Sequence, residues 1–220
     1  MPGFFFVTAE NKSHIFHSRT VLLLNRRKNA LSGFSKKTAD DVVALAQRGD
    51  VAAFKKLYQE YGNAVLRLTC GILGSVEDGK DLTQDIFIKV FNKLPELKQA
   101  EAFAGWLKQL SIRMAIDQLR QRQHWLTDDV LESFEAEPDW LQMTTALANY
   151  GEDITNLLQG LTETERAMVW LHVVEGYQHT ELATLLDCSA SAVRQRYRRA
   201  MVKLKTTLGE SAQNEQRTAI

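Results

Sequence analysis

Over most of the chain from Asp40 onward, apolar residues recur every three or four positions, the spacing that gathers them on one face of a helix. The pattern predicts a short helix over 40–48 and a longer helix that Asp50 can cap. Gly49 and Gly74 suit the positions just after the ends of these two helices. The apolar positions of the longer helix are Phe54, Leu57, Tyr58, Tyr61, Val65, Leu68 and Ile72.

Two further helices complete a first helical unit. Ser75 can open the third helix, which Pro95 stops. A fourth helix is predicted over 103–123, after a polar loop. At helical spacing such apolar residues form a core rather than a cofactor site. The residues expected inside are Leu82, Ile86, Phe87, Val90, Phe91 and Leu94 in the third helix, and Phe103, Trp106, Leu107, Leu110, Met114 and Leu119 in the fourth.

An acidic segment separates this unit from the rest of the chain. From Leu126 to Tyr150 it contains six carboxylates and neither Lys nor Arg, and its apolar residues follow no clean period. Pro138 also argues against a continuous helix there. We therefore interpret 126–154 as a flexible acidic linker.

A second helical unit follows. Thr162 and Glu165 form a capping-box pattern ahead of a helix that Gly176 ends. A short helix is predicted over 178–186, then a tight turn, and Ser189 can cap a last helix. The apolar stripe of that last helix is Val193, Tyr197, Ala200, Met201, Leu204 and Leu208. The sequence thus predicts an all-α protein, with two small helical domains joined by a flexible acidic linker.

Cations are concentrated in the last helix. The chain has 27 Lys+Arg and 27 Asp+Glu, yet six cations and no carboxylate follow Asp187 as far as Lys205. A face that is merely soluble usually mixes both signs. A short helix, a turn and a basic helix have the layout of a helix-turn-helix, whose second helix enters the major groove of DNA. The residues expected to contact bases or phosphates, or to support those contacts, are Ser189, Arg194, Arg196, Arg198, Arg199 and Lys203.

Other features narrow the class of protein. Cys70 and Cys188 lie far apart and outside any CxxC or Cys/His cluster, so we expect free thiols in a reducing, cytoplasmic setting. No run approaches eighteen apolar residues, so no membrane insertion is expected. Residues 1–37 are mostly basic and serine-bearing, and we interpret them as a disordered tail or an artefact of an upstream start codon, in preference to a transit peptide.

Residues 160–205 resemble the minus-35-binding domain of extracytoplasmic-function (ECF) sigma factors, the small two-domain members of the sigma-70 family. In the first unit, DLTQDIFIKVF and FAGWLKQLSIRMAIDQLR resemble the core-binding domain of the same family in order and spacing. Gly79 and Lys80 depart from the Ala-Glu that is usual in the family. The resemblance implies a sigma region 2 domain over 38–125 and a region 4 domain over 155–208, followed by a tail over 209–220.

The resemblance also implies a function and its partners. A sigma factor directs core RNA polymerase to specific promoters and assists promoter melting, so core polymerase, promoter DNA and an anti-sigma factor are the expected partners. No cofactor or metal ion is expected. The acidic linker would lie in the polymerase cleft as a polyanion or act only as a solubilising spacer. The residues implied are Asp81, Gln84 and Asp85 for core polymerase, and Arg113, Arg120 and Arg122 for minus-10 DNA.

Two other classes of protein fit parts of the sequence. A transcriptional regulator would use the helix-turn-helix to bind DNA without polymerase, with the first unit as a sensor. An enzyme would need a catalytic motif, and the sequence contains no HExxH, no phosphate loop and no Ser/His or Cys/His arrangement. His172, His179 and Glu175 can be considered as metal ligands, but Gly176 separates them and we expect a surface role instead.

Overall fold

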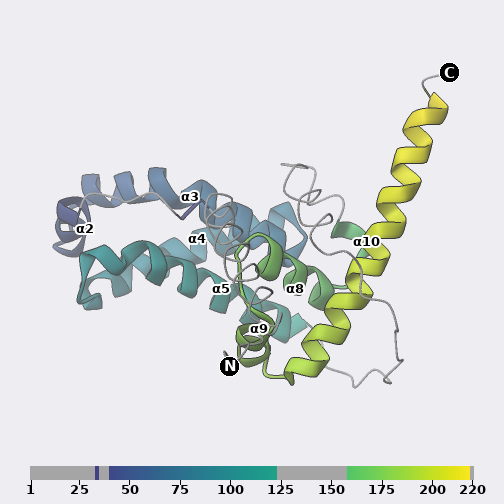
Figure 1. Cartoon of the computed structure of the whole chain (residues 1–220). Helices are drawn as coiled ribbons and strands as arrows, with labels where there is room; N and C mark the ends of the chain where they lie inside the picture. Colours follow the sequence, from purple (N-terminus) through teal and green to yellow (C-terminus); the bar gives the residue numbers. More distant parts are fainter. Residues whose placement is uncertain (1–32, 35–39, 123–157, 219–220) are drawn as a thin grey trace, which may run out of the picture.

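The computed structural model describes residues 33–34, 40–122 and 158–218, and within these ranges the secondary structure is helical, with no strand (Figure 1). The acidic linker that we expect over 126–154 lies outside the described residues. Among the described helices, none is both long and apolar enough to cross a membrane.

The first unit contains four helices: α2 (Asp40–Gln47), α3 (Val51–Leu73), α4 (Val76–Lys93) and α5 (Phe103–Arg122). Two short 3-10 helices, Leu94–Glu96 and Ala100–Ala102, connect α4 to α5. The expected caps are confirmed, because the side chain of Asp50 accepts from the Ala53 amide and that of Ser75 accepts from the Asp78 amide. Gly74 ends α3 with φ 70°, a left-handed conformation that glycine adopts without steric cost.

The core of the first unit follows the predicted stripes of α3 and α4, with two exceptions at its edge. Tyr58 is 46% exposed and Phe91 is 51% exposed. Both belong to an aromatic cluster that crosses from α3 to α4, with the Tyr58 and Phe87 ring centroids 4.7 Å apart and those of Phe54 and Phe91 5.1 Å apart. Their rings are therefore packed on one side and in water on the other.

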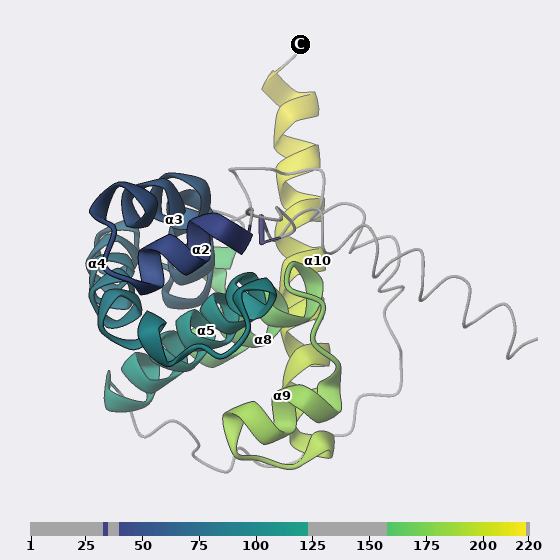
Figure 2. The same ribbon diagram turned by 90° about the vertical axis from the view of Figure 1, so that its left-hand side faces the viewer.

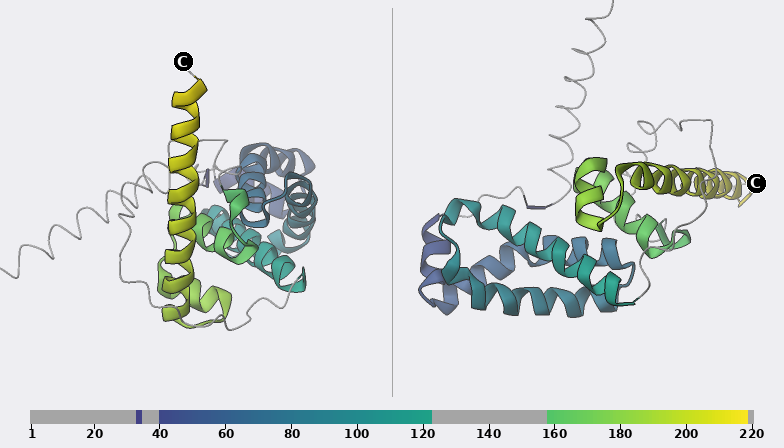
Figure 3. Two further views of the ribbon diagram at one scale, coloured as in Figure 1. Left: turned by 90° about the vertical axis from the view of Figure 1, so that its right-hand side faces the viewer. Right: turned by 90° about the horizontal axis from the view of Figure 1, so that it is seen from below.

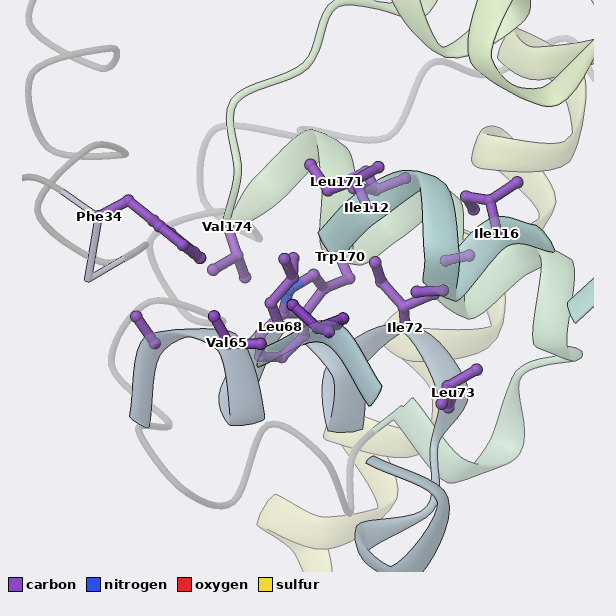
Figure 4. Packing of buried hydrophobic residues seen from close by; sticks show 14 of the residues in the cluster. Phe34, Val65, Leu68, Ile72, Leu73, Ile112, Ile116, Trp170, Leu171 and Val174 are labelled. Carbon is purple, nitrogen blue, oxygen red and sulfur yellow. The ribbon is translucent and has the colours of Figure 1, made fainter. Parts of the chain in front are cut away.

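Phe34 corrects the expectation that residues 1–37 lie wholly outside the fold. Its side chain is buried, and its ring stacks on that of Tyr61 in α3 with the centroids 6.4 Å apart. Figure 4 shows the ring pointing toward Val174, which directly follows helix α8 (Glu163–Val173) of the second unit. A single aromatic side chain can leave water in this way without any helical period around it.

The second unit consists of α8 (Glu163–Val173), α9 (His179–Leu186) and α10 (Ala190–Thr218), preceded by a 3-10 helix, Leu158–Gly160. The predicted capping box is present: the Thr162 hydroxyl accepts from the Glu165 amide and the Glu165 carboxylate accepts from the Thr162 amide. α10 extends to Thr218, well beyond the boundary at 208, and projects away from the rest of the molecule (Figure 3).

The two units pack against each other. α8 lies between α5 and α10 in Figure 2 and contacts α3, and the buried apolar residues of both units form one continuous cluster. The buried face of α5 differs from the one we expected. Ile112 and Ile116 are fully buried (Figure 4), whereas Trp106, Leu110 and Met114 are only half-buried.

Candidate polymerase and DNA interfaces

The helix-turn-helix forms as predicted. α9 ends at Asp187, which has φ 54° and ψ 51°, a left-handed conformation that Asp tolerates better than most residues. The Ser189 hydroxyl then accepts from the Ala192 amide at 3.1 Å and caps α10. Leu208 lies outside the residues whose side chains are described. The other predicted stripe residues of α10 are all buried: Val193, Tyr197, Ala200, Met201 and Leu204.

The cations of α10 differ in their exposure. Arg194 and Lys203 are exposed, and Arg196, Arg198 and Arg199 are half-buried. Lys203 is held within the unit, because its Nζ lies 2.8 Å and 2.9 Å from the two carboxylate oxygens of Glu165. Since Glu165 is buried and also caps α8, this ion pair ties the recognition helix to α8. Arg194 is thus exposed on the recognition helix, whereas exposed Lys203 is already paired with a carboxylate of its own unit.

The predicted polymerase-binding residues lie together on the outer side of α4. Asp81, Gln84 and Asp85 are exposed, whereas Leu82 and Ile86 on the opposite side are buried. Ile88 follows at the same helical spacing and is 62% exposed. We call Asp81, Gln84, Asp85 and Ile88 the α4 outer face. It combines carboxylates, an amide and an apolar side chain, which suits a protein partner more than a polyanion.

The three cations expected to contact minus-10 DNA lie on α5 in different surroundings. Arg113 is exposed. Arg122 pairs with Asp78 of α4 at 2.9 Å, and this interaction holds the pKa of the Asp78 carboxyl below its ordinary value. Arg120 lies 3.8 Å from Asp117 and donates a hydrogen bond of 3.1 Å to the Leu185 carbonyl of α9.

Sequence reasoning missed a set of residues that join the two units. Lys108 of α5 lies 2.7 Å from Glu175, whose side chain is 2% exposed. Burial raises the pKa of the Glu175 carboxyl, with the neighbouring Lys108 opposing the shift. Arg166 donates to the Leu73 carbonyl at the end of α3. One feature of the sequence could have predicted this contact. The run from Ala167 to Val174 is apolar on nearly all sides, as in a helix that is covered on several sides.

The candidate metal ligands do not form a site. The rings of His172 and His179 stack with centroids 4.5 Å apart, and Nδ1 of His172 is hydrogen-bonded with the Tyr177 carbonyl. Glu175 is buried against Lys108, so the surface role that we expected for it is wrong. Within the described ranges, no three His, Cys, Asp or Glu side chains form a group able to hold a metal ion.

Gly79, a departure from the family pattern, has a packing reason. A Cβ at this position would overlap Sγ of Cys70 on α3. The Gly79 carbonyl accepts hydrogen bonds from the hydroxyls of Thr69 and Thr83 at 2.9 Å and 2.7 Å. The small residue therefore lets α3 and α4 approach closely and bond to each other inside the core.

Family models match each of the two helical units. The family model for Sigma-70 region 2 matches residues 57–124, and the model for Sigma-70 region 4 matches residues 151–204. The ECF RNA polymerase sigma factor SigE of Mycolicibacterium smegmatis is 27% identical over 177 residues, covering 78% of this chain and 68% of the relative. The RNA polymerase sigma-H factor of Pseudomonas aeruginosa is 27% identical over 169 residues, covering 72% and 88%.

One further relative and one solved structure also match parts of this chain. The ECF RNA polymerase sigma factor SigK of Mycobacterium bovis is 26% identical over 182 residues, covering 80% of this chain and 97% of the relative. A solved structure of CnrH in complex with the cytosolic domain of CnrY matches with a TM-score of 0.46 and 22% identity, covering 78% of this chain and 97% of that one.

Both helical units thus correspond to regions of one class of transcription initiation factor, and the two matched regions together span more than half of the chain. The chain belongs to the sigma-70 family and is an RNA polymerase sigma factor of the ECF type. Sigma factors are initiation factors rather than enzymes, and the family implies core RNA polymerase and promoter DNA as partners. The alternative of a regulator that binds DNA without polymerase is not favoured.

Proposed function

We propose that the α4 outer face binds core RNA polymerase while the cations of α5 and α10 bind the minus-10 and minus-35 elements. The observation that carries the polymerase assignment is the two-sided character of α4. Asp81, Gln84 and Asp85 are exposed together, on a helix whose opposite side is fixed in the core. These side chains make no contribution to that core, which leaves them available to a partner.

For DNA, the proposal assigns different tasks to residues of different exposure. Exposed Arg194, with Arg198 one helical turn away, would contact base edges in the major groove. Half-buried Arg196 and Arg199 would contact phosphates, with Ser189 at the start of the helix and Lys203 in support. On α5, Arg113, Arg120 and Arg122 would contact the minus-10 strands. We also propose cytoplasmic action and regulation by an anti-sigma factor, both from the family resemblance.

The experiment is a co-purification of the full chain with bacterial core RNA polymerase, followed by promoter-directed transcription in vitro. We expect Asp81→Lys and Gln84→Ala to weaken binding to core polymerase while far-ultraviolet circular dichroism and the melting temperature stay unchanged. Asp41→Lys makes the same charge change at an exposed position of α2 and should bind normally. Wild-type affinity of the folded Asp81 and Gln84 variants would remove the polymerase assignment of α4.

A further inference from the structure

Three aromatic rings meet inside the second unit, one from each of the helices α8, α9 and α10. They belong to His172, His179 and Tyr197 respectively. The ring centroids of His172 and His179 are 4.5 Å apart, and that of Tyr197 lies 4.8 Å from the first and 5.0 Å from the second. We call these three residues the ring cluster. Each ring lies within contact distance of the other two, so the cluster joins all three helices at one point.

The two histidines lie at neighbouring helix ends. His172 is in the last turn of α8, and its Nδ1 is hydrogen-bonded with the Tyr177 carbonyl at 2.6 Å, in the connection to α9. His179 is the first residue of α9. The imidazole rings therefore fix the end of α8 and the start of α9 relative to each other, and Tyr197 packs on this pair from α10.

Tyr197 contributes its ring to this packing rather than its hydroxyl. The residue is 6% exposed, and its hydroxyl oxygen is buried with no hydrogen-bond partner among the described residues. A buried hydroxyl without a partner destabilises a fold. The contacts that hold α10 at this position therefore come from the aromatic ring.

Ring contacts restrict the rotation of α10 more than its other buried contacts do. The rest of its buried stripe is aliphatic or small: Val193, Ala200, Met201 and Leu204. Attraction between aliphatic groups has no preferred direction, whereas aromatic rings favour stacked or edge-on arrangements. The planes of His172 and His179 are 18° apart, and Tyr197 meets His172 edge-on at 74°. The ring cluster thus gives α10 a directional contact with the other two helices.

The same turn of α10 carries the arginines proposed to contact bases. Tyr197 lies three positions after Arg194 and one before Arg198. A helix with its side chains is about 10–12 Å across, so rotation by about 10° moves a group at its surface by about 1 Å. Hydrogen bonds span only about 2.7–3.2 Å, and a shift of this size would break a bidentate contact with a base. Base reading by Arg194 therefore depends on how α10 is rotated.

We propose that the ring cluster sets the rotation of α10 and thereby selects the base that Arg194 contacts in the minus-35 element. His172, His179 and Tyr197 are positioning residues, since they act through Arg194 and need not touch DNA. The inference rests on the proposed function, because it assumes that Arg194 contacts a base edge. It goes beyond that function by giving the two histidines a role in promoter specificity.

The test removes a ring without altering a proposed DNA-binding residue. His179→Ala removes one ring and retains the Glu181 carboxylate that accepts from the Gln178 amide at the start of α9. Thr180→Ala is the matched control, because Thr180 is the next residue of α9 and is exposed. Tyr197→Leu removes a second ring and keeps apolar bulk. His179→Phe and Tyr197→Phe keep a ring at each position.

The measurement is holoenzyme binding to a promoter that carries the minus-35 element, and to its single-base variants, at several salt concentrations. In His179→Ala and Tyr197→Leu, discrimination at the base position read by Arg194 should fall about fivefold or more, as for the loss of one arginine contact. The salt slope should not change, because long cationic side chains still reach the phosphates. The variants that keep a ring and Thr180→Ala should discriminate as wild type does.

A double variant tests whether the rings act through Arg194. In an Arg194→Ala background, His179→Ala should cause no further loss of discrimination at that position, because the contact that it positions is already absent. An additional loss of the same size as in the wild-type background would mean that the rings act independently of Arg194, and the inference would fail.

The remaining outcomes separate a positioning role from a merely structural one. Melting temperature and far-ultraviolet circular dichroism identify variants that fold, and if Tyr197→Leu does not fold, His179→Ala decides the question. Folded ring variants that bind all single-base variants more weakly by the same factor would show that the rings only stabilise the unit. Discrimination lost as fully in His179→Phe as in His179→Ala would also overturn the inference.

Failure of the proposed function has a different signature. Unchanged discrimination in Arg194→Ala alone would overturn the assignment of Arg194 to a base edge. The ring variants would then still test the rotation of α10, because rotation moves every exposed side chain of this helix and should alter preference at other positions of the element. Unaltered preference at all positions would overturn the inference as well.

Discussion

Lys108 and Glu175 form a largely buried ion pair between the two units, with Nζ of Lys108 2.7 Å from Oε2 of Glu175. The Lys108 side chain is 15% exposed and the Glu175 side chain is 2% exposed. The pair joins α5 to the end of α8, 67 positions apart in the sequence. Removing one member of such a pair leaves an uncompensated buried charge, which lowers the stability of the fold strongly. Replacing both members by apolar residues of similar volume costs much less.

The first prediction concerns the energy of this pair. Lys108→Met should lower the free energy of unfolding by about 3–5 kcal/mol, since it leaves the Glu175 carboxylate buried without a cation. The double variant Lys108→Met, Glu175→Gln should recover part of that loss. Denaturant unfolding of the two single variants and the double variant gives the coupling energy. Additive losses, with no recovery in the double variant, would mean that the two side chains do not interact.

The second prediction concerns pH. Burial raises the pKa of Glu175 above its ordinary value of 4.5, against the attraction of Lys108 and Arg67, so the folded state binds this proton more tightly than the unfolded state. The stability from this group is fully present below the ordinary pKa and is lost as the pH rises through the raised value. Compared with Glu175→Gln, wild type should lose unfolding free energy as the pH rises from below 4.5 through the raised pKa of Glu175. Denaturant unfolding at several pH values measures the difference, and parallel profiles would contradict the shift.

The third prediction follows from Phe34. Deleting residues 1–32 should leave the free energy of unfolding unchanged, whereas Phe34→Ala should lower it by about 1–3 kcal/mol, because an almost buried ring returns to water. Phe34→Leu keeps apolar area but loses the stack on Tyr61, so its free energy of unfolding should lie between those of wild type and Phe34→Ala. Promoter-directed transcription should survive deletion of residues 1–37. A loss of transcription in a folded truncation would give this segment a direct part in initiation.

The fourth prediction separates the two kinds of arginine on α10. Arg194→Ala should cost about 1–3 kcal/mol in binding to the minus-35 element and relax preference at one base position. Arg199→Ala should weaken binding to all sequences alike and reduce the slope of log affinity against log salt by about one. The measurement is holoenzyme binding to the element and its single-base variants at several salt concentrations.

Lys203→Ala is the matched variant on the same helix. Because Lys203 is paired with Glu165, its removal should lower stability more than it changes base preference. If Arg194→Ala and Arg199→Ala leave affinity, preference and salt slope all unchanged, the cations of α10 form a solvated face and the DNA assignment of this helix fails.

The sequence by itself determined the helices and their ends. Asp50, Ser75, Thr162 and Ser189 were each expected as caps and each makes the capping hydrogen bond. These features are predictable because capping and helical periodicity depend on residues within one or two turns of each other. The same local logic placed Asp81, Gln84 and Asp85 on one exposed face of α4 and identified the buried stripe of α10.

The tertiary structure alone decided which of two available faces of α5 was buried and where the units met. Ile112 and Ile116 are buried where Leu110 and Met114 are only half-buried, and Gly71 accommodates Trp170 about a hundred positions further along the chain. Nothing within a few turns of either residue encodes that pairing, because shape and charge complementarity between distant segments exists only once both have folded. The depth of Glu175, and hence the direction of its pKa shift, likewise depends on neighbours that the local sequence does not supply.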